Sequence, residues 1–274
     1  MTTPPSALSV TSHRATSPSG TLLAWVIRPG ALSGLPPLVA LHGISRNAAE
    51  MTELFLPEAE QSGRAIIVPH FPEDRWPRFQ RPGLSARPDR ALLALLSHLG
   101  ATDPALVGPV DLFGHSGGAQ LAHRFAMLYP HKLRRLNLSA AGWYCLPDAS
   151  LAYPYGIGAD AAPESLSWAR RHGEALPHYL RLAVRVFVGT EDTERDRSLR
   201  QTPMLDRSQG RTRVERAETF VSSFRAAARQ RGILPDIGLT RLAGVTHDFA
   251  QAVARGNLAR LVAADIPQRL SAAS

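Results

Sequence analysis

Residues 110–120 read Val-Asp-Leu-Phe-Gly-His-Ser-Gly-Gly-Ala-Gln and join a short apolar run to a helical pattern through a tight turn. The run before the turn is typical of a buried parallel strand, and the helical spacing after it continues until Pro130 ends it. Gly114 and Gly118 stand two residues before and after Ser116, where small residues let the two segments pass closely. The pattern predicts a nucleophile elbow with Ser116 at its tip.

On both sides of this turn the chain alternates between short apolar runs and helical patterns. Strands are expected at 21–27, 38–41, 65–68, 110–113, 136–141, 184–188 and 237–242, and helices at 48–63, 89–99, 119–129, 213–231 and 248–263. Continuous apolar runs indicate strands that are covered on both faces, so the class is α/β, with a mostly parallel central sheet flanked by helices. The alternation lapses over residues 146–182, where we expect a small cap insertion.

Length and composition agree with one globular domain. The chain has 274 residues, of which 44% are hydrophobic and 20% charged. Residues 1–19 are rich in Ser, Thr and Pro, so we expect a disordered or loosely attached arm there and the folded domain at 20–274. No run of about 18 apolar residues predicts a membrane span, and residues 1–19 lack the pattern of a secretory signal.

The cysteine content and the charge indicate the cellular compartment and the kind of partner to expect. Cys145 is the single cysteine, so no internal disulfide can form and we expect a cytoplasmic protein. The formal net charge of +8 would permit nucleic-acid binding. The basic residues are arginines apart from Lys132, and they are scattered with acids between them, as in 211–218. We interpret these arginines as solvent-exposed residues on the protein surface, and we expect neither a nucleic-acid nor a membrane partner. The oligomeric state stays open.

A serine nucleophile needs a histidine base and an acid that orients the base. In this arrangement the acid and the histidine follow later strands, in that order along the chain. Asp192 comes just after the expected strand 184–188, and His247 lies between the last strand and the last helix. The sequence therefore predicts a triad of Ser116, Asp192 and His247. The acids that compete with Asp192 are Glu191, Asp196 and Asp206.

The expected oxyanion donors and supporting histidines are assigned from their positions next to the nucleophile elbow and the strand 38–41. The oxyanion of an acyl-transfer intermediate needs two N–H donors, and we expect Gly117, after the nucleophile, and Ile44, after the strand 38–41. His42 is expected to brace the loop after that strand, and His115 and His123 to flank or cover the elbow. No metal or organic cofactor is required by this chemistry.

These motifs resemble the α/β-hydrolase superfamily over residues 20–265. Within it, residues 41–48 (Leu-His-Gly-Ile-Ser-Arg-Asn-Ala), 116–118 (Ser-Gly-Gly) and 189–193 (Gly-Thr-Glu-Asp-Thr) look like the polyhydroxybutyrate depolymerase and feruloyl esterase group. The resemblance implies an α/β-hydrolase fold and ester hydrolysis through an acyl-enzyme, and we expect a small-molecule ester as substrate.

An aromatic pocket is expected around the serine, from the loop after the strand 65–68 and from the cap region. Its candidate residues are Trp76, Phe79, Trp143, Tyr144, Tyr153 and Tyr155. Such a pocket would favour short to medium acyl chains, because each buried methylene contributes about 0.8 kcal/mol until the wall is reached. An amidase, a thioesterase or an acyltransferase on the same triad remains an alternative, as does a non-catalytic binding protein of the same fold.

Overall fold

The structure is a computed structural model that describes residues 7–83 and 86–264. An eight-stranded sheet passes through it in the order β1-β2-β4-β3-β5-β6-β7-β8. The strands are β1 (Ser9–Ser17), β2 (Gly20–Arg28), β3 (Leu38–Leu41), β4 (Ile66–His70), β5 (Val110–His115), β6 (Leu133–Ser139), β7 (Ala183–Gly189) and β8 (Ile237–Leu242). β3 to β8 pair in parallel, whereas β2 is antiparallel to both of its neighbours. The expected α/β class with a mostly parallel sheet is confirmed.

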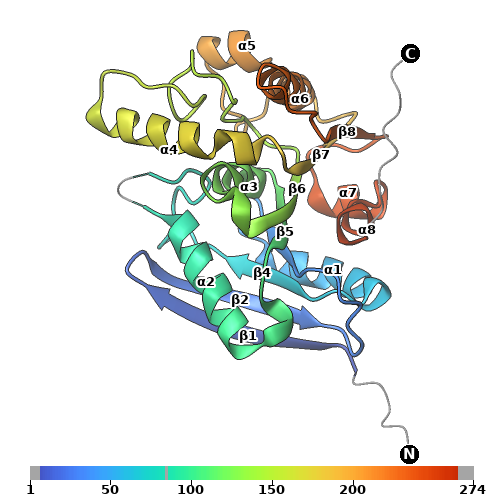
Figure 1. Ribbon diagram of the computed structural model, residues 1–274. Helices are drawn as coiled ribbons and strands as arrows, with labels where there is room; N and C mark the ends of the chain where they lie inside the picture. The colour runs from blue at the N-terminus through green and yellow to red at the C-terminus, as the bar shows by residue number, and fades with distance from the viewer. Residues whose placement is uncertain (1–6, 84–85, 265–274) are drawn as a thin grey trace, which may run out of the picture.

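Helices cover both faces of the sheet (Figure 1). They are α1 (Ala48–Ser62), α2 (Pro88–Thr102), α3 (Gly117–Leu128), α4 (Pro163–Tyr179), α5 (Pro203–Gln209), α6 (Arg213–Arg229), α7 (Phe249–Ala254) and α8 (Leu258–Ala263), with short 3-10 turns η1 (Pro104–Leu106) and η2 (Pro130–Lys132). Two apolar clusters fill the spaces between sheet and helices, one under α2, α3 and α6 and the other under α1, α7 and α8. β5 is buried along its whole length between them, as its apolar sequence predicts.

The prediction of a loosely attached arm over residues 1–19 is wrong for residues 9–17, which form the strand β1. β1 pairs with β2 along its whole length, from Ser9 opposite Arg28 to Ser17 opposite Gly20. The strand lies at the edge of the sheet and most of its side chains are exposed, so its polar composition suits its position. Residues 1–6 of the predicted arm lie outside the described residues.

The expected closing helix over 248–263 is two short helices. Asp248 caps the first, α7, by accepting a hydrogen bond of 2.7 Å from the Gln251 amide. Asn257, in a left-handed conformation with φ 52°, begins α8 after the break. The capped start of α7 matters for the site, because Asp248 directly follows His247 at the end of its loop.

The expected cap at 146–182 lies to one side of the sheet. Its helix α4 packs against α3 and η2, and Figure 1 shows it along the flank of the molecule beside α3. Within the described part of the chain, no helix has the length and apolar character needed to span a membrane.

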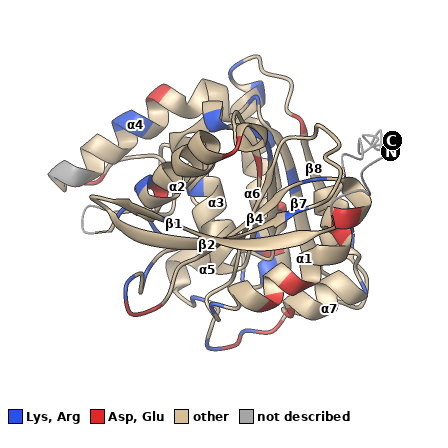
Figure 2. Cartoon of the chain, turned by 90° about the horizontal axis from the view of Figure 1, so that it is seen from below, with Lys and Arg blue, Asp and Glu red and all other residues tan. Residues whose placement is uncertain are grey.

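Basic and acidic positions are interspersed over helices, strands and loops (Figure 2). The prediction that the arginines are solvent-exposed is nevertheless wrong for four of them, which are fully buried: Arg64, Arg124, Arg213 and Arg216. A buried guanidinium needs acceptors around it, and Arg216 illustrates this by donating to the backbone carbonyls of Gly142, Arg200 and Gly210.

Candidate active site

Ser116 occupies a strained turn between β5 and α3. Its backbone has φ 54° and ψ −114°, a region that non-glycine residues rarely adopt. The two glycines around it are required by space: a Cβ on Gly114 would lie 2.3 Å from the Gly118 backbone, and a Cβ on Gly118 would lie 2.1 Å from the Leu41 carbonyl oxygen. The expected elbow geometry is therefore present, with Ser116 at the carboxyl end of the central strand.

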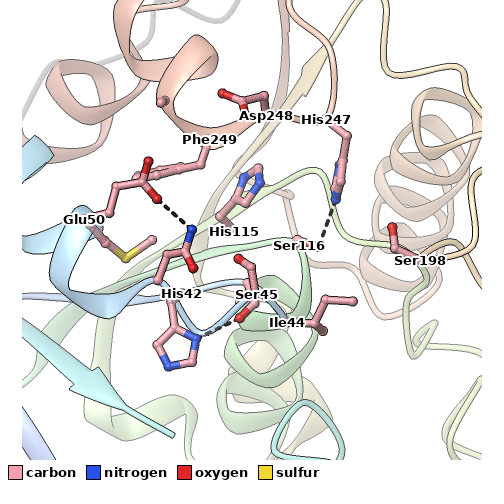
Figure 3. Close-up of a pocket in the computed structure, with 14 residues that line it drawn as sticks. His42, Ile44, Ser45, Glu50, His115, Ser116, Ser198, His247, Asp248 and Phe249 are labelled. Carbon is pink, nitrogen blue, oxygen red and sulfur yellow. Dashed lines mark hydrogen bonds between the residues drawn. The ribbon is translucent and has the colours of Figure 1, made fainter. Parts of the chain in front are cut away.

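His247 reaches Ser116 from the loop after β8 (Figure 3). Its Nε2 lies 3.0 Å from Ser116 Oγ, and its Nδ1 lies 2.9 Å from Asp192 Oδ2. An ionised carboxylate accepts hydrogen bonds only, so Nδ1 carries the proton and Nε2 offers a lone pair to the serine hydroxyl. The structure thus brings together all three residues of the predicted triad.

The other acids that compete with Asp192 face elsewhere. Glu191 is exposed, and Asp206 is paired with arginine side chains. Asp196 accepts a hydrogen bond from the Ser198 hydroxyl at 2.6 Å. Burial acts to raise the pKa of Asp196, but hydrogen bonds from Ser198 and Arg213 outweigh it and hold that pKa well below its usual value.

The two amides expected to bind an oxyanion are neighbours beside Ser116. A Cβ built on Gly117 would lie 3.3 Å from the Ile44 nitrogen and 2.7 Å from its Cγ2, so the Ile44 loop passes directly over the start of α3. Gly117 is the first residue of α3, where N–H groups have no acceptor inside the helix.

His42 braces the loop that carries Ile44, as expected. The Phe71 amide donates to His42 Nε2 at 3.0 Å, so Nδ1 carries the proton and donates to the Gly43 carbonyl at 2.8 Å. Burial lowers the pKa of His42 to about 4, and the ring therefore stays neutral. Arg46 adds a second tie between the loops by donating to the Phe71 carbonyl at 2.7 Å.

His115 lies against the imidazole of His247, with ring centroids 5.3 Å apart and an angle of 27° between the planes. Its Nδ1 lies 3.2 Å from Ser139 Oγ. Burial, helped by the nearby His247 and Arg213, holds the pKa of His115 well below its usual value. His115 is thus a neutral wall of the site that flanks the elbow, while His123 caps the Cys145 amide by accepting from it at 2.8 Å.

A cavity of about 350 Å³ opens beside Ser116. It is lined by His42, Gly43, Ile44, Ser45, Asn47, Glu50, Met51, His115, Ser116, Ser198, His247, Asp248, Phe249 and Ala250. Two carboxylates, those of Glu50 and Asp248, belong to this lining, and no arginine or lysine does among the described residues. Figure 3 shows Glu50 on one side of the cavity and Ser198 on the other.

The six aromatic residues expected to line the pocket pack elsewhere, and none of them belongs to this described lining. Phe79 lies beneath it, with its ring centroid 5.1 Å from that of His42. Trp76 packs on Phe71, Tyr144 stacks on Phe220, Tyr153 stacks on Trp168, and Trp143 packs on Tyr155. Tyr153 and Tyr155 belong to 146–182, whose helix α4 packs beside α3. The other four side chains are buried in the protein interior.

Sequence reasoning missed the polar part of the site. Asn47, Glu50 and Ser198 line the cavity, and Arg213 contacts the buried carboxylate of Asp192. Glu50 belongs to the first turn of α1, directly after the predicted Ile44 loop, and that proximity is the one signal that could have found it. Among the residues that the structure describes, no group of three His, Cys, Asp or Glu side chains could hold a metal ion.

The sequence matches no protein-family model and no curated protein. Solved structures are similar over nearly the whole chain. Poly(aspartic acid) hydrolase-1 from Sphingomonas sp. KT-1 is 22% identical with a TM-score of 0.78, over 93% of this chain and 99% of that one. The poly(3-hydroxybutyrate) depolymerase LpqC from Bordetella parapertussis is 22% identical with a TM-score of 0.75, over 92% and 94%.

A third similar structure is the S-formylglutathione hydrolase FrmB from Staphylococcus aureus, at 15% identity and a TM-score of 0.58, over 94% of this chain and 98% of that one. At these identities the likeness concerns the fold. The mostly parallel sheet, its two helical layers and the similar solved structures give this chain the α/β-hydrolase fold, which the sequence resemblance implied.

Proposed function

We propose that the protein is a serine hydrolase that cleaves carboxylic esters through an acyl-enzyme. The observation that carries the proposal is the unbroken chain of hydrogen bonds from Ser116 through His247 to Asp192, at 3.0 and 2.9 Å. A neutral serine hydroxyl is a weak nucleophile, and a base at this distance with an oriented lone pair is what activates it.

In the proposed mechanism Ser116 Oγ attacks the ester carbonyl carbon while its proton passes to His247 Nε2. The carbonyl oxygen becomes an oxyanion that accepts hydrogen bonds from the Ile44 and Gly117 amides. Asp192 stabilises the imidazolium through Nδ1. The intermediate then collapses, the alcohol leaves with the proton from Nε2, and Ser116 carries the acyl group.

Deacylation repeats these steps with water as the nucleophile. His247 Nε2 takes a proton from the water that attacks the acyl carbon, and the same amides hold the second oxyanion. Ser116 leaves with the proton from His247, which frees the carboxylic acid and restores the starting state.

The cavity favours small, uncharged esters as substrates. Its volume of about 350 Å³ lies at the lower end of the range for small-molecule pockets, and Glu50 and Asp248 give its wall negative charge. Like charges in a partly enclosed site repel, so a free carboxylate on the acyl group should weaken binding. This wall argues against a polyanion such as the polymer named for the Sphingomonas enzyme.

A panel of p-nitrophenyl esters from acetate to palmitate tests the proposal, with Ser116→Ala as the control. We expect a maximum of kcat/KM at short to medium chains and butyrate to be cleaved at least about fivefold faster than the hemisuccinate of equal carbon number. Glu50→Gln should reduce the ratio of the butyrate rate to the hemisuccinate rate, because it removes one negative charge from the cavity wall. A maximum of kcat/KM at the longest acyl chains would contradict the small cavity. Turnover of amides or thioesters without turnover of esters would overturn the proposed ester hydrolysis and indicate an amidase or a thioesterase that uses the same triad.

A further inference from the structure

We infer that Arg213 is a positioning residue of this site, whose single guanidinium holds both the carboxylate of Asp192 and the cavity-wall residue Ser198. The inference rests on the proposed function, since it assigns to Arg213 a role in keeping the Ser116–His247–Asp192 chain aligned.

The contacts of Arg213 divide between its two terminal nitrogens. Nη1 lies 3.2 Å from Asp192 Oδ1 and 3.3 Å from Asp196 Oδ2. Nη2 lies 2.7 Å from Ser198 Oγ and 3.3 Å from Asp196 Oδ1. The planar fork of a guanidinium has fixed donor directions, so these partners are held relative to one another.

Burial makes the contact with Asp192 important. The side chains of Arg213 and Asp192 are each 1% exposed. A charge removed from water is costly unless it is paired, and the contact between the two side chains offsets this cost. Asp192 uses Oδ1 for Arg213 and Oδ2 for His247, which fixes the carboxylate plane and directs Oδ2 at the imidazole.

The second nitrogen links this alignment to the substrate cavity. Ser198 lines the cavity with Ser116 and His247, and its amide and hydroxyl both donate to Asp196 Oδ1 at 2.6 Å. Arg213 binds both Ser198 and Asp196, so the loop between β7 and α5 is anchored on the first residue of α6. One buried side chain therefore sets the position of the triad acid and of one wall of the cavity.

A double-mutant cycle tests this role, with kcat measured on a short p-nitrophenyl ester. Arg213→Met should lower kcat by about 10- to 100-fold in the wild-type background but by less than about threefold beside Asp192→Asn, because the aligned carboxylate is then already lost. Arg216→Met is the matched control: Arg216 is equally buried on the same helix but has no contact with Asp192, so its effect should be the same in both backgrounds.

Arg213→Lys covers the case in which Arg213→Met does not fold. Lysine keeps the charge but cannot bridge the same partners, so this variant should lower kcat in the wild-type background but only slightly beside Asp192→Asn, and the downfield proton resonance of His247 Nδ1 should shift. An equal loss of kcat for the Arg213 variant in both backgrounds, or an unchanged kcat in a folded variant, would overturn the inference. Failure of the proposed function would look different, because Ser116→Ala would then retain the wild-type rate.

Discussion

Two histidine rings lie side by side at the site, and their hydrogen bonds assign them different tasks. His247 connects Ser116 to Asp192, whereas His115 is bonded to Ser139 and presents its ring face to His247. The ring next to the nucleophile in sequence is therefore not the one that hydrogen bonds to the nucleophile.

We predict that His247→Phe lowers kcat by on the order of 10⁴ or more, because the base is removed. His115→Phe should stay within about tenfold of wild type, because phenylalanine preserves the packing against His247. Steady-state kinetics on one ester, with circular dichroism to check folding, measures both. If the two folded variants were equally inactive, the assignment of the base would be wrong.

The residues of the triad could be predicted because each follows a strand in a motif that is local in sequence. Ser116 has its flanking glycines, Asp192 lies three residues after the end of β7, and His247 precedes the last helical segment. Arg213 gives no such signal: it reaches Asp192 across 21 positions, and only the docking of α6 against the sheet brings them together. Its charge in a mixed stretch predicted solvent exposure instead.

At the scale of elements, the turn between β5 and α3 is held by glycines that have no room for a side chain. We predict that Gly118→Ala destabilises the protein by at least about 3 kcal/mol, because the new methyl group would meet the Leu41 and His42 backbone oxygens. Thermal unfolding followed by circular dichroism measures the loss.

Gly173 is the matched control for this substitution. It is exposed in α4 and nothing lies within 4 Å of a Cβ placed on it. Gly173→Ala should therefore stabilise the protein by about 0.5–1 kcal/mol through helix propensity. A Gly118→Ala variant that unfolds at the wild-type temperature would contradict the close strand–helix approach.

Helices and strands with a clear hydrophobic pattern in their own sequence were predictable. Elements that form only because they pair with another part of the chain were not. β8 lies where its pattern places it, at Ile237–Leu242. β1 has the composition of a loop, and it is a strand because β2 offers it a full ladder of hydrogen bonds. The break between α7 and α8 was missed because apolar residues resume at Leu258 after a gap of only three residues; α7 ends at Ala254, and Asn257, in a left-handed conformation, precedes α8.

At the scale of the whole molecule, buried histidines should make stability depend on pH. Burial lowers the pKa values of His42 and His172 to about 4, against about 6.5 in an unfolded chain. Between these values the unfolded chain binds protons that the folded protein does not, so stability falls as pH decreases from about 6.5 toward 4.

Each of these two histidines should contribute a loss on the order of 3 kcal/mol by pH 4. Urea unfolding at a series of pH values measures this, and His42→Gln should flatten the dependence. Stability that stays constant or rises as the pH falls from 6.5 to 5 would show that the rings are not held neutral.

Covalent labelling with a fluorophosphonate tests most directly whether Ser116 is an activated nucleophile. Intact mass and peptide mapping should show one adduct per chain, at Ser116, and Ser116→Ala should remain unlabelled while it unfolds at nearly the wild-type temperature. Ser198 also lines the cavity and serves as the internal comparison. An adduct at Ser198, or an equal rate of labelling in Ser116→Ala, would contradict the account.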